Sequence, residues 1–119
     1  MTIFTKRVYD NLDADGYRLL EMRMWPRGVR KERVDGWDRG LAPSRTLLTA
    51  FKCGQIDWTQ YALRFTLEMK RRPDSIKSIA RLRECAKGSI VTVLCSCKNE
   101  SRCHRTLLKD LVEFGSFRG

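Results

Sequence analysis

The feature of this sequence that most constrains its fold is the segment IVTVLC at residues 90–95, which is apolar on both faces. A strand of this kind is typical of the centre of a sheet that is covered on both sides. Strands with one face exposed to solvent alternate apolar and polar residues instead. The segment therefore predicts a central, buried strand.

Two other segments are predicted to be strands. Residues 4–8 (FTKRV) are followed by a turn rich in Asn, Asp and Gly. Residues 17–25 (YRLLEMRMW) lie between Gly16 and Pro26, and proline cannot continue a ladder. The charged and glycine-rich residues 26–43 have no clean period, so we expect a loop there that can include a helical turn.

Two helices are predicted after this loop. Ser44 can cap the first helix, and Gly54 follows its end. In residues 58–71 the apolar side chains recur at the spacing of a helix. The sequence therefore predicts two consecutive helices before the apolar strand.

A third helix before the apolar strand and a fourth after it are also predicted. Pro73 suits the first turn of the third helix, which ends near Gly88. The side chains predicted to face inward from it are Ile76, Ile79 and Ala80. The last helix is expected at about residues 103–114. Strands separated by helices predict an α/β fold with a small, mostly parallel sheet flanked by helices.

The length of 119 residues predicts one domain over residues 1–119, because two halves would each be too small to bury an adequate core. No 18 apolar residues run together, so we expect no membrane partner. The first residues lack the apolar centre of a secretory signal, which favours a cytoplasmic location. The five cysteines are odd in number and unevenly spaced, so reduced thiols are expected rather than a disulfide framework.

The formal net charge of +10 favours phosphates, nucleic acid or acidic partners. One hypothesis is therefore a nucleic-acid-binding or regulatory module with a basic face. The side chains that would contact backbone phosphates are Arg27, Arg30, Lys31, Arg33, Arg39, Lys70, Arg71 and Arg72. Another hypothesis is a scaffold that binds only proteins.

The segment CSCKNESRCHR at residues 95–105 holds three cysteines and the only histidine directly after the apolar strand. Together Cys95, Cys97, Cys103 and His104 would supply a tetrahedral Cys3His zinc shell. Their spacing disfavours it, because adjacent residues at a helix start point about 100° apart. The sequence therefore predicts no metal, and it names no other cofactor.

The same segment allows other interpretations. A disulfide between Cys97 and Cys103 would make a redox switch, or a thiolate at the helix start would be stabilised by the helix dipole and by cations such as Arg102. Alternatively, free N–H groups at the helix start would seat an anion together with Arg105. His104 would transfer protons or cap a neighbouring carbonyl. Finally, the sulfurs could simply pack in the core.

A second basic segment, RMWPRG at residues 23–28, follows the second predicted strand. Ligands collect at the carboxyl ends of parallel strands, so this segment and the cysteine segment could face one crevice. Arg23 and Arg27 could grip a phosphate or carboxylate there. The structural alternative for Arg23 is an ion pair with Glu21 or a stack on an indole ring.

The segments KRVYD, DGYRLLEMRMWPRGVRKE, GWDRGLAPS, the helical segment 58–69 and VTVLCSCKN, in this order, resemble the YeaO-like branch of the domain-of-unknown-function 488 (DUF488) family. The resemblance covers nearly the whole chain. It implies a compact cytosolic α/β domain and no established reaction. The chain departs from that branch after the last strand, where Cys-Ser-Cys-Lys-Asn and then Cys-His-Arg replace the usual Lys-Asp turn. The Cys-His-Arg segment is similar to the other branch of the broader family, so the chemistry of the site transfers less directly.

Together these patterns predict that a small, phosphate-bearing anion binds in a crevice between the RMWPRG and CSCKNESRCHR segments, with thiol or redox chemistry beside it. The side chains predicted to hold the ligand are Arg23, Arg27, Arg102 and Arg105. The candidate catalytic residues are Cys97, Cys103 and His104. The patterns name neither a reaction nor an oligomeric state.

Overall fold

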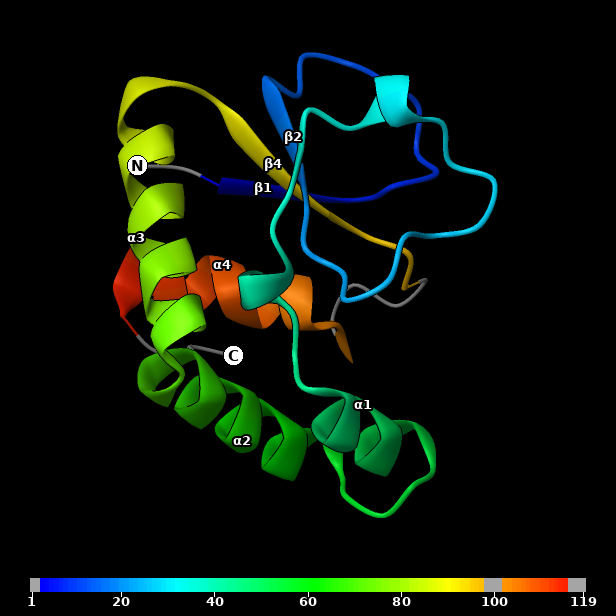
Figure 1. Cartoon of the computed structure of the whole chain (residues 1–119), viewed down its shortest axis with the longest axis vertical. Coiled ribbons are helices and arrows are strands. Elements are labelled where there is room, and N and C mark those ends of the chain that lie inside the picture. The colour runs from blue at the N-terminus through cyan, green and yellow to red at the C-terminus, as the bar shows by residue number, and fades with distance from the viewer. Residues whose placement is uncertain (1–2, 98–101, 116–119) are drawn as a thin grey trace.

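The computed structural model describes residues 3–97 and 102–115 of the chain (Figure 1). The strands are β1 (Ile3–Arg7), β2 (Tyr17–Leu20), β3 (Gly36–Trp37) and β4 (Val91–Cys95). The α-helices are α1 (Arg45–Lys52), α2 (Trp58–Arg71), α3 (Pro73–Gly88) and α4 (His104–Phe114). Two short 3-10 helices, η1 (Lys31–Arg33) and η2 (Arg39–Leu41), lie in the loop between β2 and α1.

The four strands form one parallel sheet in the order β1-β4-β2-β3. β4 therefore has a neighbour on each side, and all five of its residues are buried. In register, Ile3 of β1 lies opposite Val91 and Arg7 lies opposite Cys95. Both the central buried strand and the parallel α/β fold are confirmed.

The two faces of the sheet are covered differently. On one face Val91 and Val93 join a large apolar core to which all four α-helices contribute. On the other face Leu94 packs in a smaller core with residues of β2 and of the loop after it. In Figure 1 the part of that loop around η1, in cyan, lies away from α3 and α4, whereas η2 packs against α3. No helix in residues 3–97 or 102–115 is long and apolar enough to cross a bilayer.

The predicted helices are confirmed in position. The Ser44 hydroxyl accepts a hydrogen bond from the Leu47 N–H at the start of α1. Helix α2 spans Trp58–Arg71 as predicted and begins with a reciprocal capping box between Asp57 and Gln60. Pro73 occupies the first turn of α3.

Two predictions about local structure are wrong. The second strand ends at Leu20 rather than at residue 25. The segment predicted to be a loop contains β3, which is two residues long and pairs with β2. In α3 only Ile79 of the three predicted inward residues is buried, whereas Ile76 and Ala80 are exposed. The buried face of this helix consists of Ser75, Ser78, Ile79, Leu82 and Ala86. Two residues of this buried face are polar. The pattern of apolar residues alone therefore predicted a face that is rotated around the helix axis from the one that is buried.

Candidate functional site

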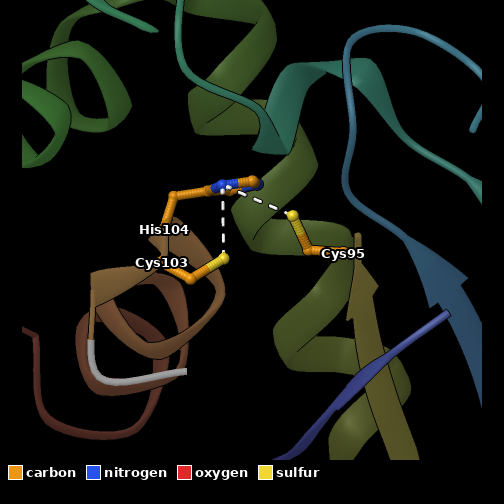
Figure 2. A group of neighbouring side chains, drawn as sticks. All are labelled: Cys95, Cys103 and His104. Atoms are coloured by element: carbon orange, nitrogen blue, oxygen red, sulfur yellow. Dashed lines mark hydrogen bonds between the residues drawn. The ribbon is translucent and has the colours of Figure 1, made fainter. Parts of the chain in front are cut away.

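The end of β4 and the start of α4 bring sulfur and imidazole together. Cys95 is the last residue of β4 and alternates along the strand with Val91 and Val93, so it faces the helices. Cys103 directly precedes α4, and His104 is the first residue of that helix. Figure 2 shows the two cysteine side chains pointing toward the imidazole ring.

The imidazole Nδ1 lies between two sulfurs. It is 4.0 Å from the Cys95 Sγ and 3.9 Å from the Cys103 Sγ. These three atoms all lie within 4.8 Å of one another, and their residues are buried. The Cys97 Sγ lies 3.6 Å from the Cys95 Sγ. This donor set could hold a metal ion.

The predicted divergence of Cys103 and His104 is wrong. Cys103 has φ −128° and ψ 145°, which is an extended conformation. The rotation of 100° per residue applies only inside a helix, so it does not separate these two side chains. Both therefore reach the same small volume.

The other nitrogen of His104 fixes the orientation of the ring. Nε2 lies 2.6 Å from the backbone carbonyl oxygen of Glu21. A carbonyl can only accept, so Nε2 carries the hydrogen and donates it. In a neutral imidazole the lone pair is then on Nδ1, which faces the two sulfurs. The predicted capping of a carbonyl by His104 is confirmed.

Two buried ionisable residues, Glu21 and Arg105, lie next to this cluster. Glu21 is 0% exposed, and neither carboxylate oxygen has a hydrogen-bond partner among the described residues. Burial raises the pKa of Glu21 well above its ordinary value. Arg105 is also buried, and its Nη1 donates to the Cys95 carbonyl at 3.5 Å.

The three thiols of the cluster titrate together. Hydrogen bonds with Cys103 and Cys97 lower the pKa of Cys95, outweighing the effect of burial. The hydrogen bond with Cys95 is the main cause that raises the pKa of Cys103. For Cys97, the hydrogen bond with Cys103 lowers the pKa, but Cys95 and burial outweigh it and raise it. The three thiols are therefore coupled, and their titration belongs to the group rather than to any one cysteine.

These groups form the floor of a pocket of about 260 Å³, which we call the cysteine pocket. Its floor consists of Cys95, Cys97, Cys103 and His104. Its cationic side chains are Arg23, Arg45, Lys52 and Arg102. Apolar and aromatic side chains, including Phe51 and Tyr61, line much of the remainder. Burial raises the pKa of Tyr61, so its hydroxyl stays neutral.

A second pocket of about 360 Å³, the arginine pocket, adjoins the first. The two pockets share Arg23, Met24 and Arg45. The side chains that line only the arginine pocket are Arg39, Ser44 and Arg72. Burial and the nearby positive charge of Arg72 lower the pKa of Arg23. The two pockets therefore form one basic depression with thiols at one end.

The predicted ligand-binding residues do not all meet in the cysteine pocket. Arg23 and Arg102 line it together with all three candidate catalytic residues. Arg23 does not pair with Glu21, because its Nε donates to the Pro43 carbonyl at 2.9 Å. Arg27 is exposed outside the pocket lining, and the buried Arg105 faces the Cys95 carbonyl. Residues 98–101 of the predicted CSCKNESRCHR loop lie outside the described residues.

The sequence interpretation missed several residues of the site. Glu21 lies directly after β2, but its burial behind His104 depends on where β4 and α4 pack. Arg45 and Lys52 lie on α1, and neither has a local pattern that distinguishes it from the other basic residues. All five cysteines of the chain are free in the structure.

Fold and site together define the class of protein. It is an α/β protein with a parallel sheet and a basic pocket that is lined by cysteines at the carboxyl end of the central strand. Residues 3–114 match the family model DUF488-N3a, described as the active DUF488-N3 subclade. The chain therefore belongs to the DUF488 family, and the resemblance found in its sequence is confirmed.

Several similar proteins are named as uncharacterized proteins. YeaO of Escherichia coli (strain K12) is 36% identical over 113 residues, which is 92% of this chain and 96% of YeaO. Rv3073c of Mycobacterium tuberculosis (strain H37Rv) and Mb3100c of Mycobacterium bovis are each 33% identical over 109 residues, covering 89% of both chains. No solved structure matches this chain significantly.

Proposed function

We propose that this protein binds a small, phosphate-bearing anion in the depression formed by the cysteine pocket and the arginine pocket. The observation that carries the proposal is the pair of arginines, Arg23 and Arg45, shared by both pockets. Guanidinium groups match phosphate oxygens with paired hydrogen bonds. A ligand seated between the pockets would contact both.

The electrostatics of the depression support an anionic ligand. Within residues 3–97 and 102–115, no carboxylate lies within ion-pair distance of Arg23 or Arg45. Burial and the positive charges of Arg72 and Arg45 lower the pKa of Arg23 by more than the carboxylates of Asp74 and Glu68 raise it. A bound phosphate would supply the missing negative charge.

The floor of the cysteine pocket supports a ligand that reaches toward the thiols. Cys97 is only partly buried, whereas Cys95 and Cys103 are almost fully covered. A phosphate held by Arg23 and Arg45 would leave the rest of the ligand facing Cys97 and His104. In this proposal Cys97, Cys103 and His104 remain the candidate catalytic residues. The description of the matching subclade as active also supports a working site.

The test is calorimetric titration of the reduced protein with inorganic phosphate. Arg45→Met should weaken phosphate binding by about tenfold, because a hydrogen bond to a charged group is lost. The matched control is Arg64→Met, which removes the same charge from an exposed position outside both pocket linings. Equal weakening in both variants, or no phosphate binding by the parent protein, would refute the proposal.

Nucleic-acid binding remains the rival prediction, and salt separates the two. A surface that contacts several backbone phosphates should lose affinity for duplex DNA steeply as salt is added. A pocket that holds one phosphate should lose much less affinity over the same range. Binding to duplex DNA with a steep salt slope and no competition from phosphate would favour the rival.

A further inference from the structure

We infer that the floor of the cysteine pocket is a zinc site, in which Cys95, Cys97, Cys103 and His104 bind one Zn²⁺ ion. The inference concerns only these four groups. It does not require the phosphate, which would be held by the cationic side chains of the two pockets. It goes against the spacing of the ligands in the sequence and rests on how the fold places them.

Three of the distances between the donor atoms approach those of a tetrahedral zinc shell. Zinc bonds of about 2.3 Å to sulfur and about 2.0 Å to nitrogen separate two sulfurs by about 3.8 Å and a sulfur from a nitrogen by about 3.5 Å. Here Cys95 Sγ and Cys97 Sγ are 3.6 Å apart. The two sulfur distances to His104 Nδ1 are 4.0 and 3.9 Å. The donor atoms of Cys95, Cys103 and His104 all lie within 4.8 Å of one another, and Cys97 Sγ would move toward them to complete the shell.

The imidazole is already oriented as a ligand. Its Nε2–H donates to the Glu21 carbonyl, which leaves the lone pair of Nδ1 directed at the sulfurs (Figure 2). Histidine ligands of metals almost always donate their second N–H to a carbonyl or carboxylate in this way. The buried carboxyl group of Glu21 also lies on this side of the ring, with its Oε1 3.8 Å from Nε2.

The surroundings suit a buried metal–thiolate centre. Cys95, Cys103 and His104 are each at most 5% exposed, so water competes little for the ion. Three thiolates and Zn²⁺ carry a net charge of −1, and the buried guanidinium of Arg105 is hydrogen-bonded to the Cys95 carbonyl next to them. Soft thiolate ligands in tetrahedral geometry select zinc over magnesium or calcium.

The zinc site would also have a structural consequence. Its ligands come from the end of β4, from the residue two positions beyond it and from the start of α4. One ion would therefore fix both ends of the connection between these elements. Bound zinc should raise the thermal stability of the protein by an amount that grows with the logarithm of its affinity.

The first test is metal content and cobalt spectroscopy of the whole chain. Protein prepared under reducing conditions should contain one zinc per chain by elemental analysis. After zinc removal, Co²⁺ should bind in the same ratio and give a thiolate-to-cobalt charge-transfer band with the visible bands of tetrahedral cobalt. This measurement uses the parent protein, so it does not depend on the folding of any variant.

The second test uses single substitutions. Cys95→Ser, Cys97→Ser and His104→Gln should each weaken Co²⁺ binding by about tenfold or more. In Cys97→Ser the charge-transfer band should also fall to the intensity of two thiolates. Cys53→Ser is the matched control, because Cys53 is exposed and distant from the site in sequence, and it should bind Co²⁺ like the parent.

Three results would overturn the inference. They are a reduced parent protein that binds no Co²⁺, Co²⁺ bound without thiolate charge transfer, and Cys53→Ser losing as much affinity as Cys95→Ser. Phosphate titration of the metal-free protein separates this failure from that of the proposed function. If the parent protein binds phosphate but does not bind Co²⁺, only the zinc site is refuted and the proposed phosphate binding stands.

Discussion

At the scale of single residues, the buried ion pair between Asp15 and Arg18 shows how charge is accommodated outside the site. Asp15 pairs with Arg18 and also with Lys6, whose Nζ lies 3.0 Å from Oδ1. The backbone carbonyl of Asp15 accepts a hydrogen bond from the Thr92 hydroxyl of β4. Burial raises the pKa of Asp15, but the hydrogen bonds from Lys6 and Arg18 lower it by a larger amount, so the net shift is downward.

Asp15→Asn should therefore destabilise the protein by about 3 kcal/mol at neutral pH, because Arg18 stays buried without its partner. In the parent protein, the contribution of this carboxylate is present above its unfolded pKa of 3.8 and is lost as pH falls through the lower folded value. Urea unfolding from neutral pH to about pH 3 should show this acid loss in the parent and not in the variant.

Asp13→Asn is the control for this experiment. Asp13 is exposed, so its variant should follow the pH dependence of the parent. An Asp15→Asn protein with the same acid loss as the parent would contradict the assignment of that loss to Asp15.

At the scale of elements, helix α3 is held against η2 by a close backbone contact. Gly40 lies against Ser78 of α3, and an added Cβ would collide with the Ser78 hydroxyl and approach the Asp74 carbonyl to 3.0 Å. The Ser78 hydroxyl also donates to Asp38 Oδ1 at 2.7 Å, and the same carboxylate oxygen caps Gly40. This contact explains why Ser78 lies on the buried face of α3.

Gly40→Ala should destabilise the protein by about 1–3 kcal/mol, because the added methyl group overfills this contact. Gly88→Ala adds the same methyl group near the end of α3, where no heavy atom lies within 4 Å of the new Cβ. It should be neutral or stabilising by up to about 1 kcal/mol, because alanine favours a helix. Thermal or urea unfolding of the two variants compares them, and equal stabilities would contradict the proposed packing.

At the scale of the whole molecule, β4 joins the two apolar cores. It pairs with β1 on one side and β2 on the other, and its side chains enter both cores. The edge strand β3 pairs only with β2 in the described sheet. Opening the amides of β4 therefore requires the separation of both neighbours and the loss of core packing.

Hydrogen exchange should show this difference directly. Amides of β4 should exchange roughly tenfold or more slowly than those of β3, because they open only in large-scale unfolding. Exchange followed by NMR under native conditions measures both strands in one sample. Equal protection of β3 and β4 would contradict the central role assigned to β4.

Local patterns in the sequence determined most of the elements. The apolar segment at 90–95 predicted the central strand β4, and helical spacing located α1, α2 and α3, with Ser44 and Pro73 marking the starts of α1 and α3. These signals are local, because side-chain period and capping act within a few residues. The same patterns failed for the buried face of α3, where Ser78 packs against Gly40 from a distant segment.

The cysteine segment itself was evident from the sequence, but only the tertiary structure decided the geometry of the site. Cys103 and His104 converge because Cys103 is extended and because the Glu21 carbonyl orients the ring. Arg45 joins the same pocket from α1. Residues this far apart along the chain meet through the packing of whole elements, which no short-range pattern encodes.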